Sequence, residues 1–304
     1  MTSFWSSSNR CGPVDKSLIN IQNLAEPSSS DTIEFRLGVD NRLGPARAAL
    51  IDVISGFFYW PLWTRLAWLE IVQKYRRSIL GPFWITASTA IMTISLGIIY
   101  SSLFKTNINE FIPYLSVGLI AWGFIGSIIT EAGGLFTGAQ SYITQIRLPF
   151  SIYVYRFVWT RLIIFGHNFV IYLGVIAYFR LPLGPALLLA IPGLVLFTLN
   201  AAFVSTYLGM SSLRFRDVPQ IINSLFQIVL FVTPIFWKPE MLGANSRLVA
   251  FNPFYHFIEV LRAPLLGHVP AMESYIAVGL LTVANLLIAA FFFVNYRRRI
   301  TYWI

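Results

Sequence analysis

The sequence predicts an all-α integral membrane protein with six transmembrane helices. An amphipathic interface helix is expected before the first span, and a re-entrant helical element before the last. Hydrophobic residues make up 56% of the 304 residues and charged residues only 12%, and the mean hydropathy is +0.67. Because soluble domains carry about 25% charged residues, most of this chain is expected to face lipid or to pack beside lipid-facing helices.

Six predominantly apolar runs set the expected spans, because about twenty apolar residues cross a hydrocarbon core of roughly 30 Å. They lie at about residues 83–104, 111–133, 150–179, 186–213, 218–237 and 274–296. Residues 61–304 are thus expected to form one six-span domain. Residues 1–60 are expected to be a flexible extension with a short apolar or interfacial helix, at residues 48–59, interrupted by Asp52.

An amphipathic helix is predicted over residues 61–77. Four apolar residues recur there at helical spacing: Leu62, Leu66, Leu69 and Val72. Charged residues, including Arg65 and Lys74, lie largely off this stripe. Such a helix lies in the membrane plane with its basic end toward anionic headgroups.

The distribution of Lys and Arg near the span ends predicts the orientation. About ten fall on one face, namely Lys74, Arg76, Arg77, Arg147, Arg156, Arg214, Arg216 and Arg297 to Arg299, against about five on the other, namely Lys105, Arg180, Lys238, Arg247 and Arg262. The richer face is expected to be cytoplasmic, with both termini inside. The net charge of +9 is then explained by the Lys and Arg residues that orient the chain in the membrane, and no nucleic-acid partner is needed to explain it.

Residues 252–262 are too short and too charged to cross the membrane. Asn252 and Pro253 begin a predicted helix in which Glu259 and Arg262 stand three residues apart and can pair across one turn. Non-spanning structure at membrane depth is tolerated where it is buried in protein or lines a cavity. A re-entrant element is therefore expected.

The sequence favours transport over catalysis. It holds no G-x-x-x-x-G-K-[ST] loop, no H-E-x-x-H and no G-x-S-x-G, and its one cysteine, Cys11, has no cysteine partner. The three histidines show no metal-ligand spacing, and the acids of the outer face are scattered over different loops: Glu110, Glu240, Glu259 and Glu273. No cofactor or metal site is expected on this chain.

Ionisable residues in spans are costly and often functional. Arg156 and Arg161 open the third span, and two interpretations stay open: they snorkel to the interface, or they line a path for an anionic group such as a pyrophosphate. Aromatic residues expected near the outer boundary, among them Tyr100, Trp237 and Tyr255, form either an ordinary aromatic belt or a stacking surface for sugars.

Four motifs in the same order resemble the membrane subunits of ABC-type polysaccharide exporters, the O-antigen, capsule and teichoic-acid export permeases of the type-2 exporter fold. They are Lys-Tyr-Arg-Arg-Ser-Ile-Leu-Gly-Pro-Phe-Trp at 74–84, Ile-Thr-Gln-Ile-Arg-Leu-Pro at 143–149, Arg-Asp-Val at 216–218 with Thr-Pro-Ile at 233–235, and the segment 252–262. The resemblance covers about residues 60–304.

The resemblance implies a homodimer with two separate ATP-binding cassette subunits, which hold the ATP and Mg²⁺. A polyprenyl-diphosphate-linked glycan would move outward across a bacterial inner membrane. Contact with the ATPase would involve the amphipathic helix and the segment around residues 140–147, and the residues expected there are Arg65, Lys74, Gln140, Tyr142, Gln145 and Arg147. Arg156 and Arg161 would meet the diphosphate.

Two alternatives remain open at this stage. A small-molecule or lipid exporter of the same superfamily would share the six-span plan. A membrane-embedded transferase acting on lipid-linked sugars would need clustered carboxylates at a membrane face, and the sequence does not place them together.

Overall fold

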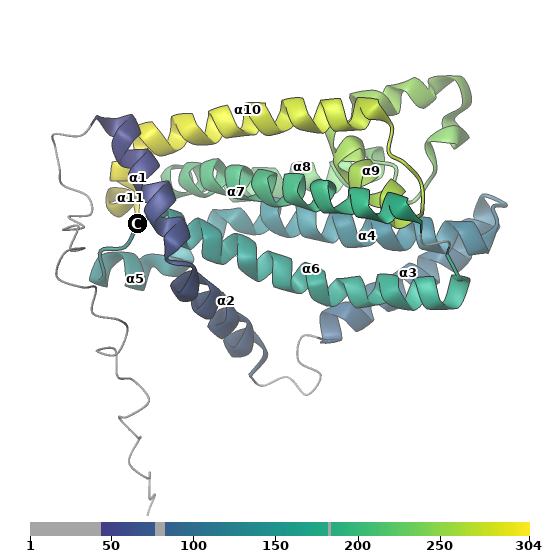
Figure 1. Cartoon of the computed structure of the whole chain (residues 1–304), viewed down its shortest axis with the longest axis horizontal. Helices are drawn as coiled ribbons and strands as arrows, with labels where there is room; N and C mark the ends of the chain where they lie inside the picture. The colour runs from purple at the N-terminus through teal and green to yellow at the C-terminus, as the bar shows by residue number, and fades with distance from the viewer. Residues whose placement is uncertain (1–43, 77–82, 182–183) are drawn as a thin grey trace, which may run out of the picture. The chain divides into compact units, whose positions relative to one another are not determined.

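The computed structural model describes residues 44–76, 83–181 and 184–304, and every regular element in these ranges is a helix (Figure 1). The α-helices are α1 (Pro45–Phe58), α2 (Trp60–Tyr75), α3 (Phe83–Leu103), α4 (Ile108–Glu131), α5 (Gln140–Gln145), α6 (Ser151–Phe179), α7 (Ala190–Arg214), α8 (Val218–Val232), α9 (Pro253–Leu265), α10 (Met272–Tyr296) and α11 (Ile300–Trp303). Short 3₁₀ segments occur at Ala132–Gly134, Thr137–Ala139, Pro185–Leu189, Pro239–Phe251 and Arg297–Arg299. The all-α prediction is confirmed. The flexible extension predicted at residues 1–60 lies outside the described ranges as far as residue 43.

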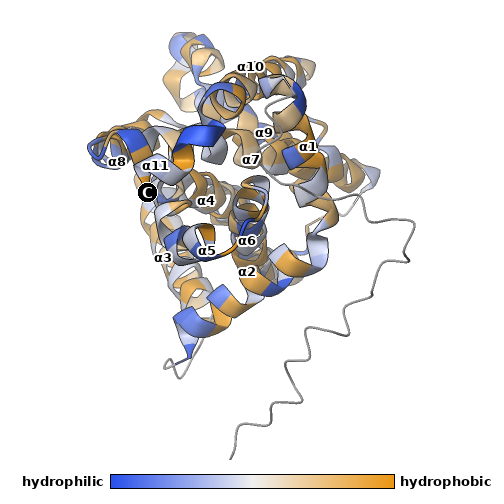
Figure 2. Ribbon diagram, turned by 90° about the vertical axis from the view of Figure 1, so that its left-hand side faces the viewer, coloured by the Kyte–Doolittle hydropathy of each residue, from blue (hydrophilic) through white to orange (hydrophobic). Residues whose placement is uncertain are grey.

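Five helical segments are long and apolar enough to cross a membrane: Phe83–Leu103, Ile108–Gly134, Ser151–Phe179, Pro185–Arg214 and Met272–Trp303. Each matches a predicted span to within a few residues. In Figure 2 hydrophobic residues cover much of the ribbon of the long helices, rather than only the sides that face one another. Large apolar side chains such as Ile91, Leu194 and Leu287 are exposed, as lipid-facing residues must be. The chain is a multi-pass membrane protein.

The fifth predicted span, 218–237, contains a helix that is shorter than the predicted span. Helix α8 ends at Val232 after 15 residues, a rise of about 22 Å against a hydrocarbon core of roughly 30 Å. Thr233 is extended, with φ −86° and ψ 133°, because a residue before a proline is driven out of the helical region, and Pro234 follows it.

Helix α8 nevertheless runs antiparallel along most of α4. At one end a Cβ on Gly133 would lie 2.8 Å from Pro219 Cγ, and at the other the Tyr114 hydroxyl donates to the Pro234 carbonyl at 3.0 Å. Residues 218–234 thus extend from one end of α4 to the other, although the helical part of this segment ends at Val232. The count of six spans stays a prediction.

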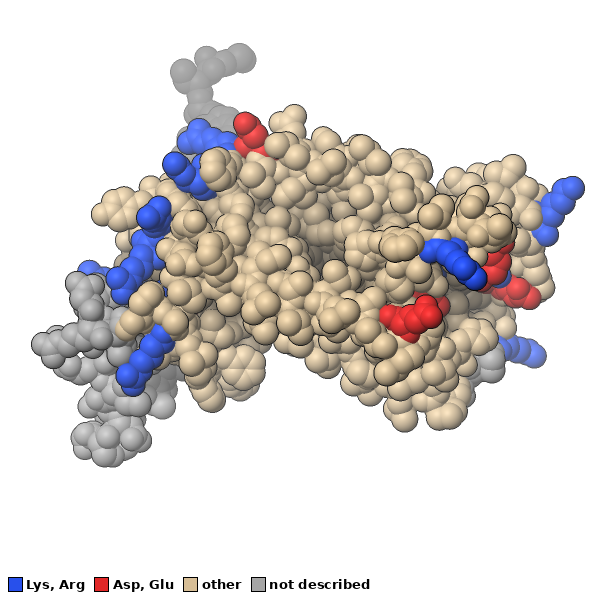
Figure 3. Space-filling model, turned by 90° about the horizontal axis from the view of Figure 1, so that it is seen from above, with Lys and Arg blue, Asp and Glu red and all other residues tan. Residues whose placement is uncertain are grey.

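Charged side chains separate into two groups along the long helices. In the view of Figure 3 Lys and Arg gather at both ends, acids accompany them mainly at one end, and a wide band between shows no charge. The end that holds α1, α5 and α11 (Figure 1) is the one to which Arg147, Arg214 and Arg297 belong. An uncharged band between two charged ends is what a bilayer requires.

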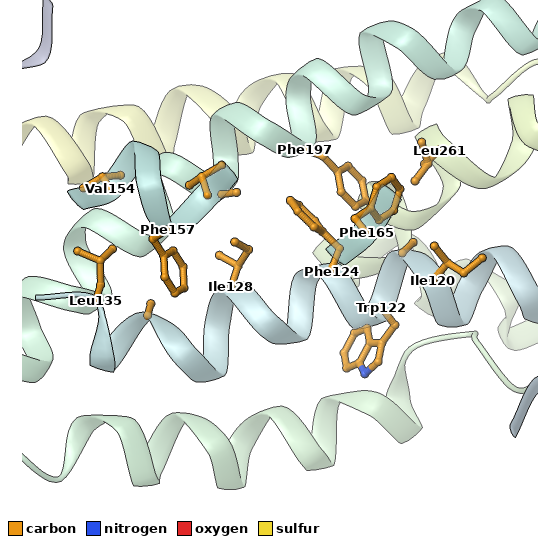
Figure 4. Close-up of a cluster of buried hydrophobic side chains, with 14 of the residues drawn as sticks. Ile120, Trp122, Phe124, Ile128, Leu135, Val154, Phe157, Phe165, Phe197 and Leu261 are labelled. Carbon is orange, nitrogen blue, oxygen red and sulfur yellow. The ribbon is translucent and has the colours of Figure 1, made fainter. Parts of the chain in front are cut away.

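The core is built around α4, which packs against α3, α6, α7, α8 and α9. Figure 4 shows Phe124 of α4, Phe165 of α6 and Phe197 of α7 pointing toward one another. Their ring centroids are 5.4 Å and 5.8 Å from Phe124. Trp122 points the other way and stacks on Phe226 of α8 at 4.3 Å. Aromatic packing therefore joins α4 to three neighbours.

The helix expected at residues 61–77 is present as α2, and its amphipathic role at the membrane stays a prediction. Trp63, Ala67 and Ile71 lie on the packed side, since Ala67 and Ile71 are buried and Trp63 contacts two aromatic rings of α6. The face packed on α6 is therefore not the predicted stripe, of which Leu62 and Leu66 are partly buried and Leu69 and Val72 are exposed.

Asp52 of α1 joins three helices. Its carboxylate accepts from the backbone N–H of Phe150 (3.2 Å) and Ser151 (3.0 Å), which begin α6, and pairs with Arg297 Nη1 at 3.1 Å, just after α10. The first N–H groups of a helix have no partner within it, and a carboxylate is favourable there. Gly56 permits the close approach, because a Cβ there would overlap the Ser151 hydroxyl. The apolar segment around Asp52 is thus a packed helix.

We expect Asp52→Ala to lower the free energy of unfolding by about 3 kcal/mol, because it leaves a buried arginine without its partner. Unfolding in detergent would be measured by chemical denaturation. Arg297→Ala combined with Asp52→Ala should cost less than the sum of the single changes. The exposed Glu240→Ala is the matched control, and an equal loss for Glu240→Ala would contradict the assignment.

Candidate functional site

Arg262 of α9 is buried, with 2% of its surface exposed, and its guanidinium is hydrogen-bonded within the protein. Its Nη2 and Nε donate to Glu259 Oε2 at 2.7 Å and 3.1 Å, and its Nη1 donates to the Pro234 carbonyl at 2.9 Å. The guanidinium carbon lies 3.9 Å from the centre of the Tyr114 ring. The predicted pairing of Glu259 with Arg262 is confirmed, and the pair also reaches α4 and the end of α8.

Asn252 makes the second attachment of α9. Its side-chain oxygen accepts from the N–H groups of Phe254 and Tyr255 and so caps the helix, while its amide donates to Thr233 Oγ1 at 3.0 Å and to the Val232 carbonyl at 3.4 Å. Both ends of α9 are therefore bonded to the segment where α8 breaks. A helix of 13 residues held in this way does not cross the membrane.

Aromatic rings gather beside this attachment. Tyr100 of α3 stacks on Phe104 at 5.6 Å and on Phe236 at 5.9 Å. Tyr114 donates to the Trp237 carbonyl at 3.1 Å. The structure thus brings Tyr100 close to the segment that carries Trp237, two residues that the sequence placed only at the same boundary. Tyr255 is half-buried on α9.

Tyr114 is the residue that sequence reasoning missed. Its ring lies under the Arg262 guanidinium, and its hydroxyl donates to the backbone carbonyls of Pro234 and Trp237, after the end of α8. No local pattern marks a tyrosine for this role, because the partners lie about 120 residues away in the chain.

Arg156 and Arg161 are both paired with carboxylates from other helices. Arg161 is 6% exposed and contacts Glu131 of α4 at 2.8 Å, and its guanidinium also lies over the Phe157 ring at 4.8 Å. Arg156 Nε lies 3.6 Å from Glu70 Oε2 of α2. Neither arginine snorkels freely to the interface, and neither is an uncompensated cation. A role in meeting a diphosphate stays a prediction.

Helix α8 carries a polar stripe on an otherwise apolar surface. Gln220, Asn223, Ser224 and Gln227 recur at helical spacing, and all four are exposed. The other sides of α8 carry apolar residues, including Ile222 and Phe226, which face the bundle. Polar side chains in a segment at membrane depth need water or another protein surface.

An apolar cavity of about 340 Å³ lies between α8 and the neighbouring helices α4, α7, α9 and α10. Ile128, Phe197 and Ile222 are among its lining residues. Three polar residues, Asn200, Tyr207 and Asn285, line one side of the cavity. The Asn285 amide donates to Asn200 Oδ1 at 2.9 Å, and the Tyr207 hydroxyl donates to Asn285 Oδ1 at 3.3 Å. Over this stretch α8 is therefore supported mainly by α4.

The residues expected to contact an ATPase are all exposed: Arg65 and Lys74 on α2, Gln140, Tyr142 and Gln145 on α5, and Arg147 just after it. The segment expected around residues 140–147 contains the short helix α5, in which Ile143 is buried. Exposure leaves these side chains available to a partner.

Among the residues that the structure describes, no group of three His, Cys, Asp or Glu side chains could hold a metal ion. His256 is buried and has a partner on each ring nitrogen, the Ser274 hydroxyl at 3.0 Å and the Ala250 carbonyl at 2.8 Å. This histidine is satisfied within the fold, as the sequence indicated.

The long apolar helices define a multi-pass membrane protein, in which the broken α8 is bonded to the short helix α9. The family model of ABC-2 type transporters matches residues 61–266, more than half of the chain, so the chain belongs to this family. The motif-based resemblance is thereby confirmed.

Two relatives are both described as O-antigen export system permease protein RfbA from Klebsiella pneumoniae. One is 24% identical over 199 residues, which cover 62% of this chain and 74% of the relative. The other is 23% identical over 232 residues, which cover 72% of this chain and 87% of the relative. Both relatives are permeases, in line with the expectation of a transport subunit.

We expect Asn252→Ala to loosen α9, because it removes the helix cap and the bond to Thr233. An N-cap substitution costs about 1 kcal/mol, and amide hydrogen exchange over residues 253–265 should quicken by several-fold. Asn295→Ala is the matched control, since that side chain bonds only to Phe291 of its own helix. Unchanged exchange in α9 of the Asn252 variant would show that the cap does not hold it.

Proposed function

We propose that the chain is the membrane subunit of an ATP-driven exporter that moves a polyprenyl-diphosphate-linked polysaccharide from the cytosolic side of a bacterial inner membrane outward. The similarity to two O-antigen export permeases over most of their length supports this substrate class. The charge asymmetry between the helix ends supports a cytoplasmic location for both termini.

The observation that carries the proposal is the polar stripe of α8. A second copy of the chain would place two such stripes face to face, with water between them. Gln220, Asn223 and Gln227 offer amide donors and acceptors that match the hydroxyl groups of a glycan. The path therefore runs between the two copies, and α8 is its wall.

Aromatic residues would guide the sugars at the far end of this wall. Tyr100, Trp237 and Tyr255 are partly exposed, and aromatic rings of this kind would pack against the apolar faces of sugars. Arg156 and Arg161 remain candidates to meet the diphosphate. Because each is paired with a carboxylate, that role requires the ion pairs to open.

Energy would come from two copies of a separate ATP-binding cassette subunit, which hold the ATP and Mg²⁺. The exposed side chains of α5 and α2 form the surface for that subunit, and α5 directly precedes α6. A push on α5 would therefore reach the α6 terminus that Asp52 holds.

Co-expression of the chain with a candidate ATP-binding cassette subunit, in the presence of the lipid-linked glycan, tests the proposed function. We expect the two proteins to copurify and glycan to stimulate ATP hydrolysis in vesicles. Asn223→Leu with Gln227→Leu should remove most of this stimulation while copurification persists, because it makes the stripe apolar. Leu225→Met with Ile228→Leu, on the same helix, should leave it intact. Stimulation that survives the stripe variant would remove α8 from the path.

We expect Arg147→Glu to weaken copurification of the ATPase about tenfold or more, because reversal of a charge at an interface is costly. Arg247→Glu is the control, an exposed arginine at the opposite end of the helices. Co-immunoprecipitation of tagged subunits measures the effect. An equal loss for both variants would place the ATPase surface elsewhere.

A further inference from the structure

The cavity between α8 and the helices α4, α7, α9 and α10 follows one face of α7. The residues of α7 that line it are Phe197, Asn200, Ala201, Val204, Tyr207 and Leu208. Residues at such spacings lie on the same side of a helix. From Phe197 to Leu208 the helix rises by about 16 Å, so the cavity is elongated along the helix axis.

The volume of the cavity suits a hydrocarbon chain. An apolar cavity of about 150 Å³ holds a benzene ring, so one of about 340 Å³ has room for roughly a dozen carbon atoms. Because this volume is spread over about 16 Å of α7, the cavity forms a narrow slot. Such a slot fits one extended chain better than it fits a compact ring system.

The polar groups in the wall are already bonded to protein partners. The Asn200 amide donates to Thr282 Oγ1 at 2.7 Å and to the Leu196 carbonyl at 2.8 Å, and its oxygen accepts from Asn285 at 2.9 Å. The Tyr207 hydroxyl donates to Asn285 Oδ1. The remaining lining residues are apolar. A hydrocarbon therefore matches the wall better than a polar ligand does.

The cavity opens between α8 and α10. Helix α8 packs mainly on α4, and α10 packs on α7 and α9; no close packing joins α8 to α10, two helices that the structure describes in full. Figure 2, which looks along the long helices, shows α8 and α10 at separate edges of the bundle. Both helices carry exposed apolar side chains, such as Leu225 and Leu280. An opening between two such helices meets the hydrocarbon of the bilayer.

Aromatic rings close the end of the cavity beside α9. The Phe254 ring lies 5.7 Å from Trp122 and 6.2 Å from Phe226. At the other end Ile222 lies about 6 Å along α8 from its first residue, near the charged end of the bundle that includes Arg214. A lipid chain in the slot would thus have its headgroup at the level of Arg214 and its methyl end beneath α9.

We propose that this cavity binds one acyl chain of a membrane phospholipid, drawn from the leaflet on the side of α5 and α11. Phospholipids supply most hydrocarbon chains in a membrane, and occupancy of a site rises with ligand concentration. The lining residues all belong to the described part of the chain and none is charged, so the wall does not select a diphosphate-linked carrier. The phospholipid is not the transported substrate, and the site goes beyond the proposed function.

Photo-labelling of the full-length chain in vesicles tests the site. The probe is phosphatidylethanolamine with a diazirine in the middle of one acyl chain, and mass spectrometry of peptides identifies the labelled residues. We expect label on the cavity floor, at Val204 and Tyr207. Label is also expected at Val195, which is exposed on the opposite side of α7 and serves as the internal reference for bulk lipid.

Two variants reduce the volume of the slot from different sides. Ala201→Phe fills it from α7, and Ile222→Phe narrows it from α8. Each should lower the label on the cavity floor several-fold while the label at Val195 persists, because the new ring occupies the place of the acyl chain. Leu199→Phe is the matched control, since Leu199 is exposed on the opposite side of α7, and it should leave the label on the cavity floor unchanged.

Three outcomes would overturn the site. The first is a natural chain without label on the cavity floor, and the second is label there that persists in both filling variants. The third is label in the monomer that is lost in the dimer, which would show that a second copy covers the opening. Displacement of the label by a polyprenyl phosphate, where equal unlabelled phosphatidylethanolamine has no effect, would assign the cavity to the carrier lipid and overturn the phospholipid.

Discussion

The break in α8 at Pro234 sets a constraint that the rest of this end of the molecule satisfies. The helix stops short of a full crossing, and its last carbonyls would face a region without water, where an unpaired polar group is costly. Asn252 and Arg262, near the two ends of α9, donate to the carbonyls of Val232 and Pro234. The short helix is thus the partner of the break, and the two features require each other.

At the opposite end of the long helices, a buried charge of opposite sign also binds backbone groups. Asp52 accepts from the first N–H groups of α6 and pairs with Arg297, whereas Arg262 donates to a carbonyl and pairs with Glu259. Each buried charge collects backbone groups at a place where the chain changes direction. Between these two anchors, α8 has the apolar cavity on one side and its polar stripe on another.

The interpretation of Arg156 and Arg161 on α6 depends on partners that only the structure shows. Read along the chain, Arg156 and Arg161 are two cations in an apolar helix, compatible with snorkelling or with a path for anions. Glu70 and Glu131 lie on other helices, and their pairing turns the two cations into links between α2, α4 and α6.

The sequence by itself determined the fold class, five of the spans to within a few residues and the pairing of Glu259 with Arg262. These features follow from local composition and from spacing within one helix. Pro234 is visible in the sequence as well, but the apolar run continues past it, so hydropathy alone does not mark the end of α8. Only the tertiary structure decided the packed face of α2, the role of Tyr114 and the partners of Asp52, Arg156 and Arg161. Each depends on residues from different helices that meet across the bundle, and no periodicity along the chain encodes which helices become neighbours.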